Sequence, residues 1–230
     1  KTPRIRFKGF TDAWEQRKFN ELYERVSEKN DLSYGVQEII SVANMYYKDD
    51  SNISDNEYLR TYNVFKLGDI AFEGNKSKDF KYGRFVENTI GNGIVSHVFD
   101  VFRPIMPQYD LYYWKYAINN ERIMRQVLIR CTKASTMMTN LVANDFLEEK
   151  ILVPKYEEQK RIGAFIIQLD NLITLHQRKC DKLKTIKAAL LEKMFPQGDA
   201  TTPKIRFKGF TYTWEQRKFG EMFKERREKT

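Results

Sequence analysis

The sequence predicts an α+β protein, with a globular domain over residues 1–155 followed by a long coiled-coil-forming helix over 156–196. Residues 1–155 mix alternating apolar runs with segments of helical spacing, and Pro154 closes them. Residues 157–195 contain no proline and a single glycine, and their apolar residues recur at spacings of three and four. Residues 197–230 are expected to form a linker and the start of a second domain.

Composition narrows the classes of protein to which the chain can belong. Among 230 residues there are 16 Phe, 13 Tyr and 3 Trp, enough apolar mass to exclude wholesale disorder. No 18-residue apolar stretch is present, so no membrane span is expected. No secretory leader is visible, and the two cysteines, Cys131 and Cys180, lie far apart and are expected to form neither a disulfide framework nor a metal-ligand cluster. These features indicate a cytoplasmic location.

The elements of the first domain follow from local periodicity. Residues 14–29 are expected to form a short amphipathic helix, because Trp14, Phe19, Leu22 and Val26 share one helical face. A further helical stretch is predicted over 109–129. The segments with strand character are 36–47, 67–75, 83–88 and 93–103, and 139–153 is expected to hold a short helical turn and one more strand.

A 17-residue segment occurs twice, 200 residues apart. Residues 3–19 read PRIRFKGFTDAWEQRKF and residues 203–219 read PKIRFKGFTYTWEQRKF, with three differences. A period of 200 is too long for a solenoid. The repeat therefore indicates one domain-plus-helix unit followed by the opening of another, although a repeated linker is the alternative.

The predicted long helix carries an apolar stripe that it cannot bury by itself. Its coiled-coil positions require a partner helix, from this chain or from another. His176 and Lys179 interrupt the middle of the stripe, and His176 is expected to set the register. The residues expected to form the coiled coil are Ile162, Phe165, Leu169, Leu172, His176, Leu183, Ile186 and Leu190.

Charge is distributed unevenly along the chain, whose formal net charge is +9. Residues 1–156 carry a net charge of only +2, while residues 20–57 are acidic. Two segments, 76–84 and 115–133, carry net charges of +3 and +4. Together they are able to form a cationic face for a phosphate backbone, although ordinary solvated surface is an equally good interpretation of local charge.

The sequence lacks the residue patterns that are typical of catalytic sites. Neither histidine has a Cys or His at metal-ligand spacing, and no Walker A or Asn-Pro-Pro-Tyr sequence is present. Asp69 and Glu73 faintly resemble a nuclease carboxylate set, but Asn75 stands where such a set has lysine, so Asp69 is expected to be a turn residue. We therefore expect no metal, no cofactor and no enzyme activity.

Residues 133–196 closely resemble the end of a recognition domain and the following helix in specificity (S) subunits of type I restriction-modification systems. The resemblance is strongest in ILVP, Glu158-Gln159-Lys160, Leu169-Asp170 and Lys193-Met194-Phe195, and WEQRKF, KLGDIAF and GIVSHVFDVFRP also fit. It implies a non-catalytic, sequence-specific DNA recognition subunit. The implied partners are double-stranded DNA, DNA methyltransferase (modification) subunits and restriction subunits.

Such subunits usually hold two recognition domains and two antiparallel helices, and each domain reads one half of a split target. This sequence holds one domain, one helix and the opening of a second, so the resemblance implies a half or truncated subunit. We expect a homodimer through antiparallel pairing of the long helix. A coiled-coil adaptor that binds protein and has no DNA role is the alternative.

Residues expected to contact DNA are polar or aromatic and lie beside basic ones in loop-like segments. Three groups meet this description, and the second is favoured because charge, glycine-flanked turns and tyrosine coincide there. The first is Asn44, Tyr46, Tyr47 and Lys48; the second is Asn75, Lys76, Lys78, Lys81, Tyr82 and Arg84; the third is Arg130, Lys133, Ser135 and Thr136.

Overall fold

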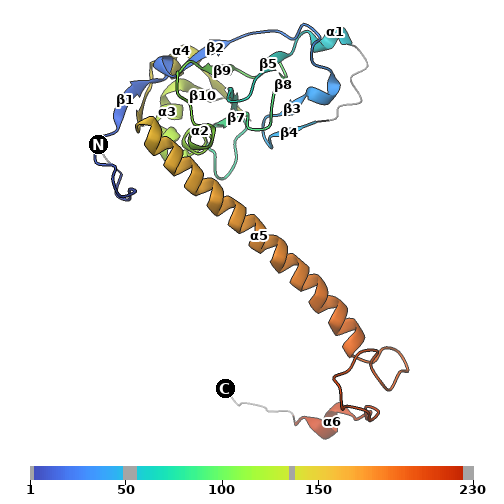
Figure 1. Ribbon diagram of the computed structural model, residues 1–230. Coiled ribbons are helices and arrows are strands. Elements are labelled where there is room, and N and C mark those ends of the chain that lie inside the picture. Colours follow the sequence, from blue (N-terminus) through green and yellow to red (C-terminus); the bar gives the residue numbers. More distant parts are fainter. Residues whose placement is uncertain (1–2, 49–55, 135–137, 225–230) are drawn as a thin grey trace, which may run out of the picture. The chain divides into compact units, whose positions relative to one another are not determined.

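Four antiparallel strands in the order β2, β9, β6, β7 form the largest sheet of the computed structural model (Figure 1). Their bounds are Tyr23–Val26, Val101–Pro104, Ile70–Glu73 and Arg84–Glu87. Strand β6 is buried on both faces: Ile70 and Phe72 join one hydrophobic core, and Ala71 between them joins another. This division follows from the alternation of side chains along a strand.

The structure describes residues 3–48, 56–134 and 138–224. The chain forms two compact units, residues 1–168 and 169–230. Besides the main sheet, the described part of the first unit holds four antiparallel two-stranded pairs: β1–β12, β3–β4, β5–β8 and β10–β11. These strands are Glu15–Lys18 and Lys150–Val153, Ile40–Ser41 and Tyr46–Tyr47, Asn63–Phe65 and Gly93–Val95, and Thr132–Ala134 and Thr139–Leu141.

Short helices cover one face of the main sheet. They are α2 (Leu111–Ile118), α3 (Glu121–Cys131) and α4 (Ala143–Glu148), while α1 (Asn56–Leu59) and the 3-10 turns Phe19–Glu21 and Val36–Glu38 lie in connections. Asp110 and Asn120 cap the first two helices by accepting backbone hydrogen bonds. Phe146 of α4 stacks on Phe85 with ring centroids 4.3 Å apart, which fixes these helices against the sheet.

The structure confirms most of the expected elements and corrects two. The strands within 67–75, 83–88 and 93–103 are present, as are the helical turn and strand within 139–153. The expected helix over 109–129 is two helices, because Asn120 caps a new one. The expected helix over 14–29 is wrong: the segment forms β1, a 3-10 turn and β2, since pairing with β12 and β9 overrides its helical spacing.

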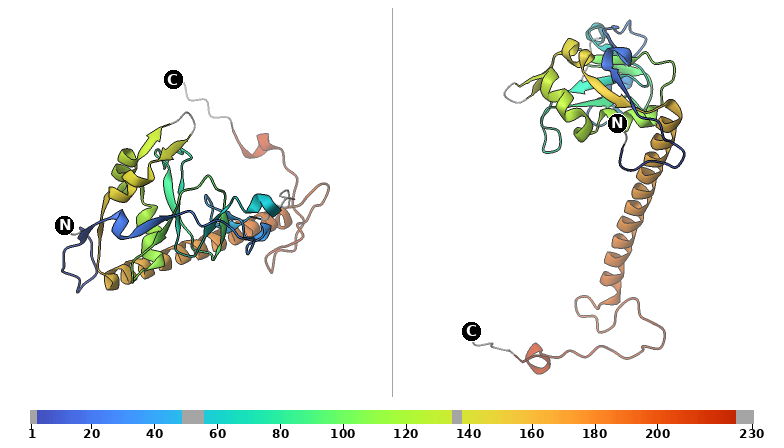
Figure 2. Two further views of the ribbon diagram at one scale, coloured as in Figure 1. Left: turned by 90° about the horizontal axis from the view of Figure 1, so that it is seen from above. Right: turned by 90° about the vertical axis from the view of Figure 1, so that its left-hand side faces the viewer.

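Helix α5 runs unbroken from Tyr156 to Met194, as the sequence predicts (Figure 2). Its first turns belong to the first unit, where Gly163 allows a close approach to α2. A Cβ at that position would lie 2.4 Å from the Asp110 carboxylate. None of the described helices combines the length and apolar composition that a membrane crossing requires.

In the second unit, the second copy of the repeat follows α5 and ends in the short helix α6 (Phe219–Met222). The Ile205 backbone N–H donates to the Lys193 carbonyl (3.0 Å), and the Phe195 and Trp214 rings meet edge to face at 5.8 Å. Phe219 is 77% exposed, whereas its counterpart Phe19 in the first copy is fully buried. The same sequence therefore has two different environments in one chain.

Candidate nucleic-acid interface

The loop at the end of the β6–β7 hairpin, residues 74–83, presents the basic residues of the second expected group. Lys76, Lys78 and Lys81 are exposed. The loop is held by a turn in which the Ser77 backbone N–H donates to the Phe80 carbonyl (3.1 Å) and the Ser77 hydroxyl accepts from the Phe80 N–H (3.0 Å). The lysines therefore project from a defined turn.

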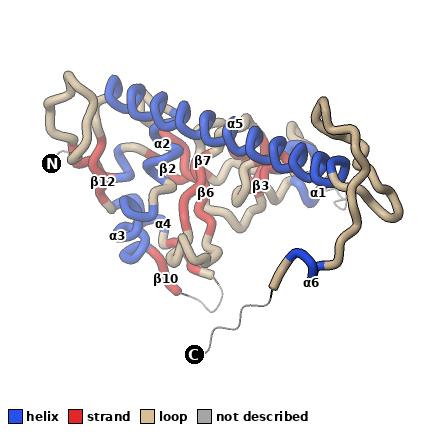
Figure 3. The backbone as a smooth tube through the Cα atoms, turned by 90° about the horizontal axis from the view of Figure 1, so that it is seen from below, coloured by secondary structure: helices blue, strands red, loops and turns tan. Residues whose placement is uncertain are grey.

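The β10–β11 hairpin lies directly against the end of the β6–β7 hairpin (Figure 3). Thr139 donates to the Gly74 carbonyl through both its backbone N–H (2.8 Å) and its hydroxyl (3.1 Å), and Asn75 forms a β-bridge with Met138. A Cβ on Gly74 would lie 2.2 Å from the Thr139 carbonyl oxygen, so only glycine allows this approach. The second and third expected groups are thus neighbours.

Arg84 links the turn that carries the first expected group to the end of the β6–β7 hairpin. Its guanidinium donates to the Ala43 carbonyl (2.7 Å) and to the buried carboxylate of Glu73 (2.7 Å), and it lies over the Phe80 ring. Arg84 therefore braces the β3–β4 turn against β7, and its charge is engaged within the protein. It is a positioning residue for this surface rather than an exposed cation.

The first group surrounds the β3–β4 turn. Asn44, Tyr46, Tyr47 and Lys48 are all exposed, and the two tyrosines expose 49% and 42% of their surface. The Tyr47 hydroxyl donates to the Asn92 carbonyl (3.1 Å), which orients its ring. Exposed tyrosines beside basic loops supply the stacking and hydrogen-bonding groups that nucleic-acid surfaces use.

Two other members of the expected set, Arg130 and Tyr82, lie apart from this pattern. Arg130 forms a bidentate ion pair with Glu149 at 2.6 and 2.5 Å, so its charge is already matched. Tyr82 is half-buried and packs against the larger core. Lys133 is exposed on β10, opposite Asn140. Ser135 and Thr136 lie outside the described residues.

Two exposed residues that sequence reasoning missed, Met138 and Asn140, lie beside these loops. Asn140 faces Lys133 across the hairpin, and Met138 bridges to Asn75. An amide and an exposed apolar side chain are both groups that contact base edges. Neither residue lies in a loop rich in basic and aromatic residues: Asn140 belongs to the short strand β11, and Met138 directly precedes it.

Two acidic residues of the main sheet region, Asp69 and Glu73, form ion pairs with arginines. Both oxygens of Asp69 accept from Arg103 (3.0 and 2.9 Å), and one also accepts from the Lys66 N–H, which confirms Asp69 as a turn residue. Burial raises the pKa of Asp69, while Arg103 opposes that shift. Within the described ranges, no three His, Cys, Asp or Glu side chains are grouped to hold a metal ion.

The expected coiled-coil residues fall into two sets. Ile162 is half-buried and packs against the domain's larger core, and Phe165 meets Phe7 edge to face at 5.5 Å while remaining 48% exposed. From Leu169 onward, no residue of the stripe belongs to any of the three hydrophobic cores formed by the described residues. Its exposed members are Leu169, Leu172, His176, Leu183, Ile186 and Leu190.

A sequence profile described as the type I restriction modification DNA specificity domain matches residues 12–185. The chain belongs to this family. The match spans the hairpin loops, the end of the first repeat copy and most of α5. Specificity subunits of type I systems are non-catalytic, so family membership confirms the expectation that this specificity domain is not an enzyme. No curated protein sequence matches the chain significantly.

A solved structure shares the fold at low sequence identity. A chain from a study of complex assembly and conformational transition of the type I R-M system has a TM-score of 0.55 and 16% identity, over 84% of this chain and 52% of that one. An S subunit from M. genitalium gives 0.49 and 18%, over 84% and 49%. An HsdS subunit from Thermoanaerobacter tengcongensis gives 0.47 and 14%, over 80% and 45%. The chain spans about half the length of these structures.

Proposed function

We propose that this specificity domain reads one half of a split DNA target for a type I restriction-modification system. The observation that carries the proposal is the meeting of the three expected segments at the end of the β6–β7 hairpin. Gly74, next to the second group, contacts Thr139 on the hairpin that carries Lys133 of the third, and Arg84 holds Ala43 beside the first. Segments 65 and 41 residues apart in sequence are thereby joined.

On this surface the exposed cations and the polar side chains have separate tasks. Lys76, Lys78, Lys81 and Lys133 neutralise phosphates and set the position of the domain on the duplex. Asn44, Tyr46, Tyr47 and Asn75 are exposed donors and acceptors between them, and they reach base edges. The two tyrosines, Tyr46 and Tyr47, supply contact area without adding charge.

The exposed stripe of α5 supports an assembly of two copies. A helix with an unburied apolar stripe requires a partner, and antiparallel pairing places two recognition domains at opposite ends of one coil. Such a homodimer reads a two-part target whose spacer is set by helix length. The remaining helix surface docks DNA methyltransferase subunits, to which restriction subunits join.

The experiment is methylation-site mapping in cells that carry this chain with its methyltransferase subunit, combined with DNA binding by the purified complex. We expect methylation confined to one split sequence, and binding that depends on both sequence and salt. Methylation without sequence preference, or binding equal on all duplexes, would refute DNA readout. In that case the chain would be an adaptor built on its helix.

A further inference from the structure

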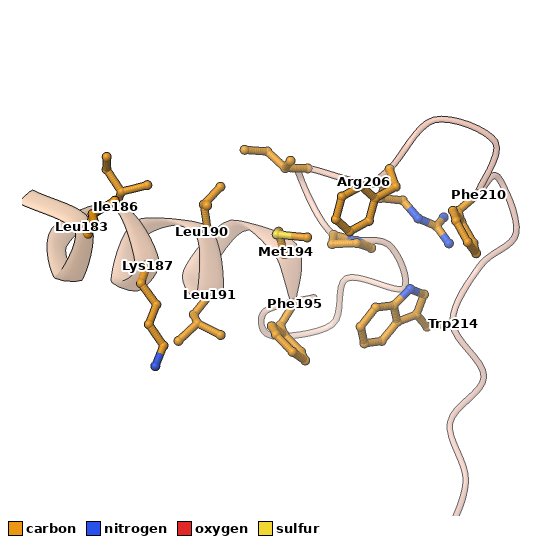
Figure 4. A pocket seen from close by; sticks show the side chains of 13 residues that line it. Leu183, Ile186, Lys187, Leu190, Leu191, Met194, Phe195, Arg206, Phe210 and Trp214 are labelled. Carbon is orange, nitrogen blue, oxygen red and sulfur yellow. The ribbon is translucent and has the colours of Figure 1, made fainter.

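An apolar pocket lies at the C-terminal end of α5, inside the second unit (Figure 4). Its cavity measures about 600 Å³. One wall is the helix stripe at Ile186, Leu190 and Met194, and the other is the second repeat copy, with Phe207 and Trp214. Figure 4 shows the side chains of Ile186, Leu190 and Met194 along the helix and the Trp214 ring on the chain that follows it.

The heptad pattern of α5 favours one antiparallel register with a second α5. Antiparallel coils place the first core position of one heptad opposite the fourth of its partner. In the favoured register the facing pairs are Phe165 with Leu190, Leu169 with Ile186, Leu172 with Leu183, and His176 with Lys179. Every apolar core position from Phe165 to Leu190 then meets an apolar one, and the two polar positions meet each other at the centre. Ile162, which would face Lys193, packs against the core of its own domain.

The registers shifted by one heptad in either direction do not pair every apolar core position with an apolar one. A shift of one heptad in one direction sets Leu169 opposite Lys179, and a shift in the other sets Leu169 opposite Lys193. Each places a lysine against a leucine in a buried layer, which costs the desolvation of its ammonium group. A central polar layer is the established device by which coiled coils select one register.

Charge along the helix favours the antiparallel direction. Residues 156–177 hold three acidic and two basic side chains, whereas residues 178–194 hold six basic and two acidic ones. Parallel pairing would place two +4 segments side by side. Antiparallel pairing places each beside a segment of net charge −1. This argument selects a second copy of the helix as the partner.

We propose that the pocket of each copy receives the Phe7–Phe165 ring pair of the other. The favoured register sets Phe165 opposite Leu190, which lines the pocket. Phe7 accompanies Phe165 because their rings meet at 5.5 Å, and Phe165 is half exposed. The inference rests on the homodimer of the proposed function and adds its register. The first repeat copy of one chain thereby meets the second repeat copy of the other.

A disulfide trap in the full-length chain tests this contact. Phe165→Cys and Leu190→Cys are combined in a Cys180→Ser background and exposed to a mild oxidant. We expect covalent dimers whose linked peptides contain positions 165 and 190. The matched control, Phe165→Cys with Leu183→Cys, brings together positions that only the register shifted by one heptad would join, and it should remain uncrosslinked.

The possible outcomes distinguish the pocket contact from the homodimer and from DNA recognition. Sedimentation that finds only monomers at micromolar concentration would overturn both the pocket and the homodimer. Dimers that crosslink 165 with 183, or neither pair, would overturn the pocket contact alone. DNA binding by the complex with the methyltransferase subunit is measured separately, so loss of this contact is distinguishable from loss of DNA readout.

A second measurement avoids cysteine chemistry. Phe207→Ala removes a pocket wall, and Phe219→Ala removes an equally exposed ring of the same repeat copy that does not line the pocket. We expect the first change to raise the dimer dissociation constant by about tenfold or more, because buried aromatic anchors dominate interfaces. The second should leave it unchanged. Equal constants for both variants would exclude the pocket from the interface.

Discussion

Arg6 holds Glu158 through two parallel hydrogen bonds of 2.7 Å each, and so fastens the first repeat copy to the first turn of α5. The Glu158 side chain is 1% exposed, and the Trp14 indole N–H also donates to it (3.2 Å). The carboxylate lies where the helix macrodipole favours negative charge. The first repeat copy, which the sequence assigns to the domain with a repeated linker as the alternative, is thus bound to that domain by side-chain contacts.

Replacing this carboxylate should destabilise the first unit. Glu158→Gln removes the charge that Arg6 binds and is expected to lower the free energy of unfolding by about 2–3 kcal/mol. Glu157→Gln is the matched control, because Glu157 is exposed in the same turn and pairs only with Lys160. Its effect should stay within about 0.5 kcal/mol. Chemical denaturation of both variants measures the difference, and equal stabilities would contradict a structural role for Glu158.

Gly74→Ala should separate the two hairpins of the candidate interface. The added Cβ would lie 2.2 Å from the Thr139 carbonyl, so backbone must move, at a cost of about 1–3 kcal/mol. DNA affinity should fall with stability because the second and third segments part. Gly220→Ala is the control, since no atom lies within 4 Å of its Cβ position. Unfolding and DNA binding assays that show no difference between the variants would contradict this packing.

Lys76→Ala combined with Lys78→Ala should weaken DNA binding and reduce its salt dependence. If each lysine neutralises one phosphate, the slope of log affinity against log salt should fall by about 2. Lys204→Ala with Lys208→Ala removes the same charge from exposed positions of the second repeat copy. That control should retain the original slope. An unchanged slope in the first variant would remove the β6–β7 loop from the interface.

Glu87 makes stability depend on pH. Burial raises its pKa to about 9, although the Tyr109 hydroxyl donates to one carboxylate oxygen; the other oxygen is buried without a described partner. Because the folded-state pKa lies above the unfolded one, this group stabilises the fold fully below about pH 4.5. That contribution is lost as pH rises toward 9, at up to about 1.4 kcal/mol per pH unit.

Glu87→Gln should remove this loss. Relative to the unmodified chain, the variant should gain stability progressively between pH 5 and pH 9, because a neutral amide replaces the carboxyl that must ionise. Denaturation curves at several pH values provide the measurement. Parallel pH profiles for the two proteins would show that Glu87 ionises normally in the folded state.

Leu169→Asp should abolish dimerisation and methyltransferase docking while the first unit stays folded. Leu169 is 41% exposed, so no core is opened, but a charge would enter the proposed seam. Ala188→Asp introduces the same charge at an exposed position on the opposite helix face and serves as control. Sedimentation and circular dichroism measure both properties. A dimeric Leu169→Asp variant would contradict the seam.

The local pattern of the chain was sufficient for its long elements. Helix α5 follows directly from 39 residues without proline, and the β6 and β7 strands follow from buried apolar runs bounded by glycine. Residues 14–29 show the limit of that reasoning. Their helical spacing is real, but Glu15–Lys18 pairs with Lys150–Val153, more than 130 residues away, and those backbone hydrogen bonds outweigh a weak local propensity.

For the candidate site, too, local sequence was sufficient for some residues and insufficient for others. Exposure of Lys76, Lys78, Tyr46 and Tyr47 agrees with their polar, loop-like sequence context. That Arg130 is matched by Glu149, and Arg84 by Glu73, was invisible because these partners are distant in sequence. Asn140 was overlooked since only the pairing of β10 with β11 sets it beside Lys133.

By itself, the sequence determined the α+β class, the long helix with its exposed stripe, the repeat and the family. Each of these depends on residue order over short distances, or on identity between segments. Tertiary structure decided which loops share a surface, which charges remain exposed, and which contacts bind the first repeat copy to α5. Those outcomes depend on contacts such as Gly74 with Thr139 and Arg6 with Glu158, which form only when segments distant in sequence pack together.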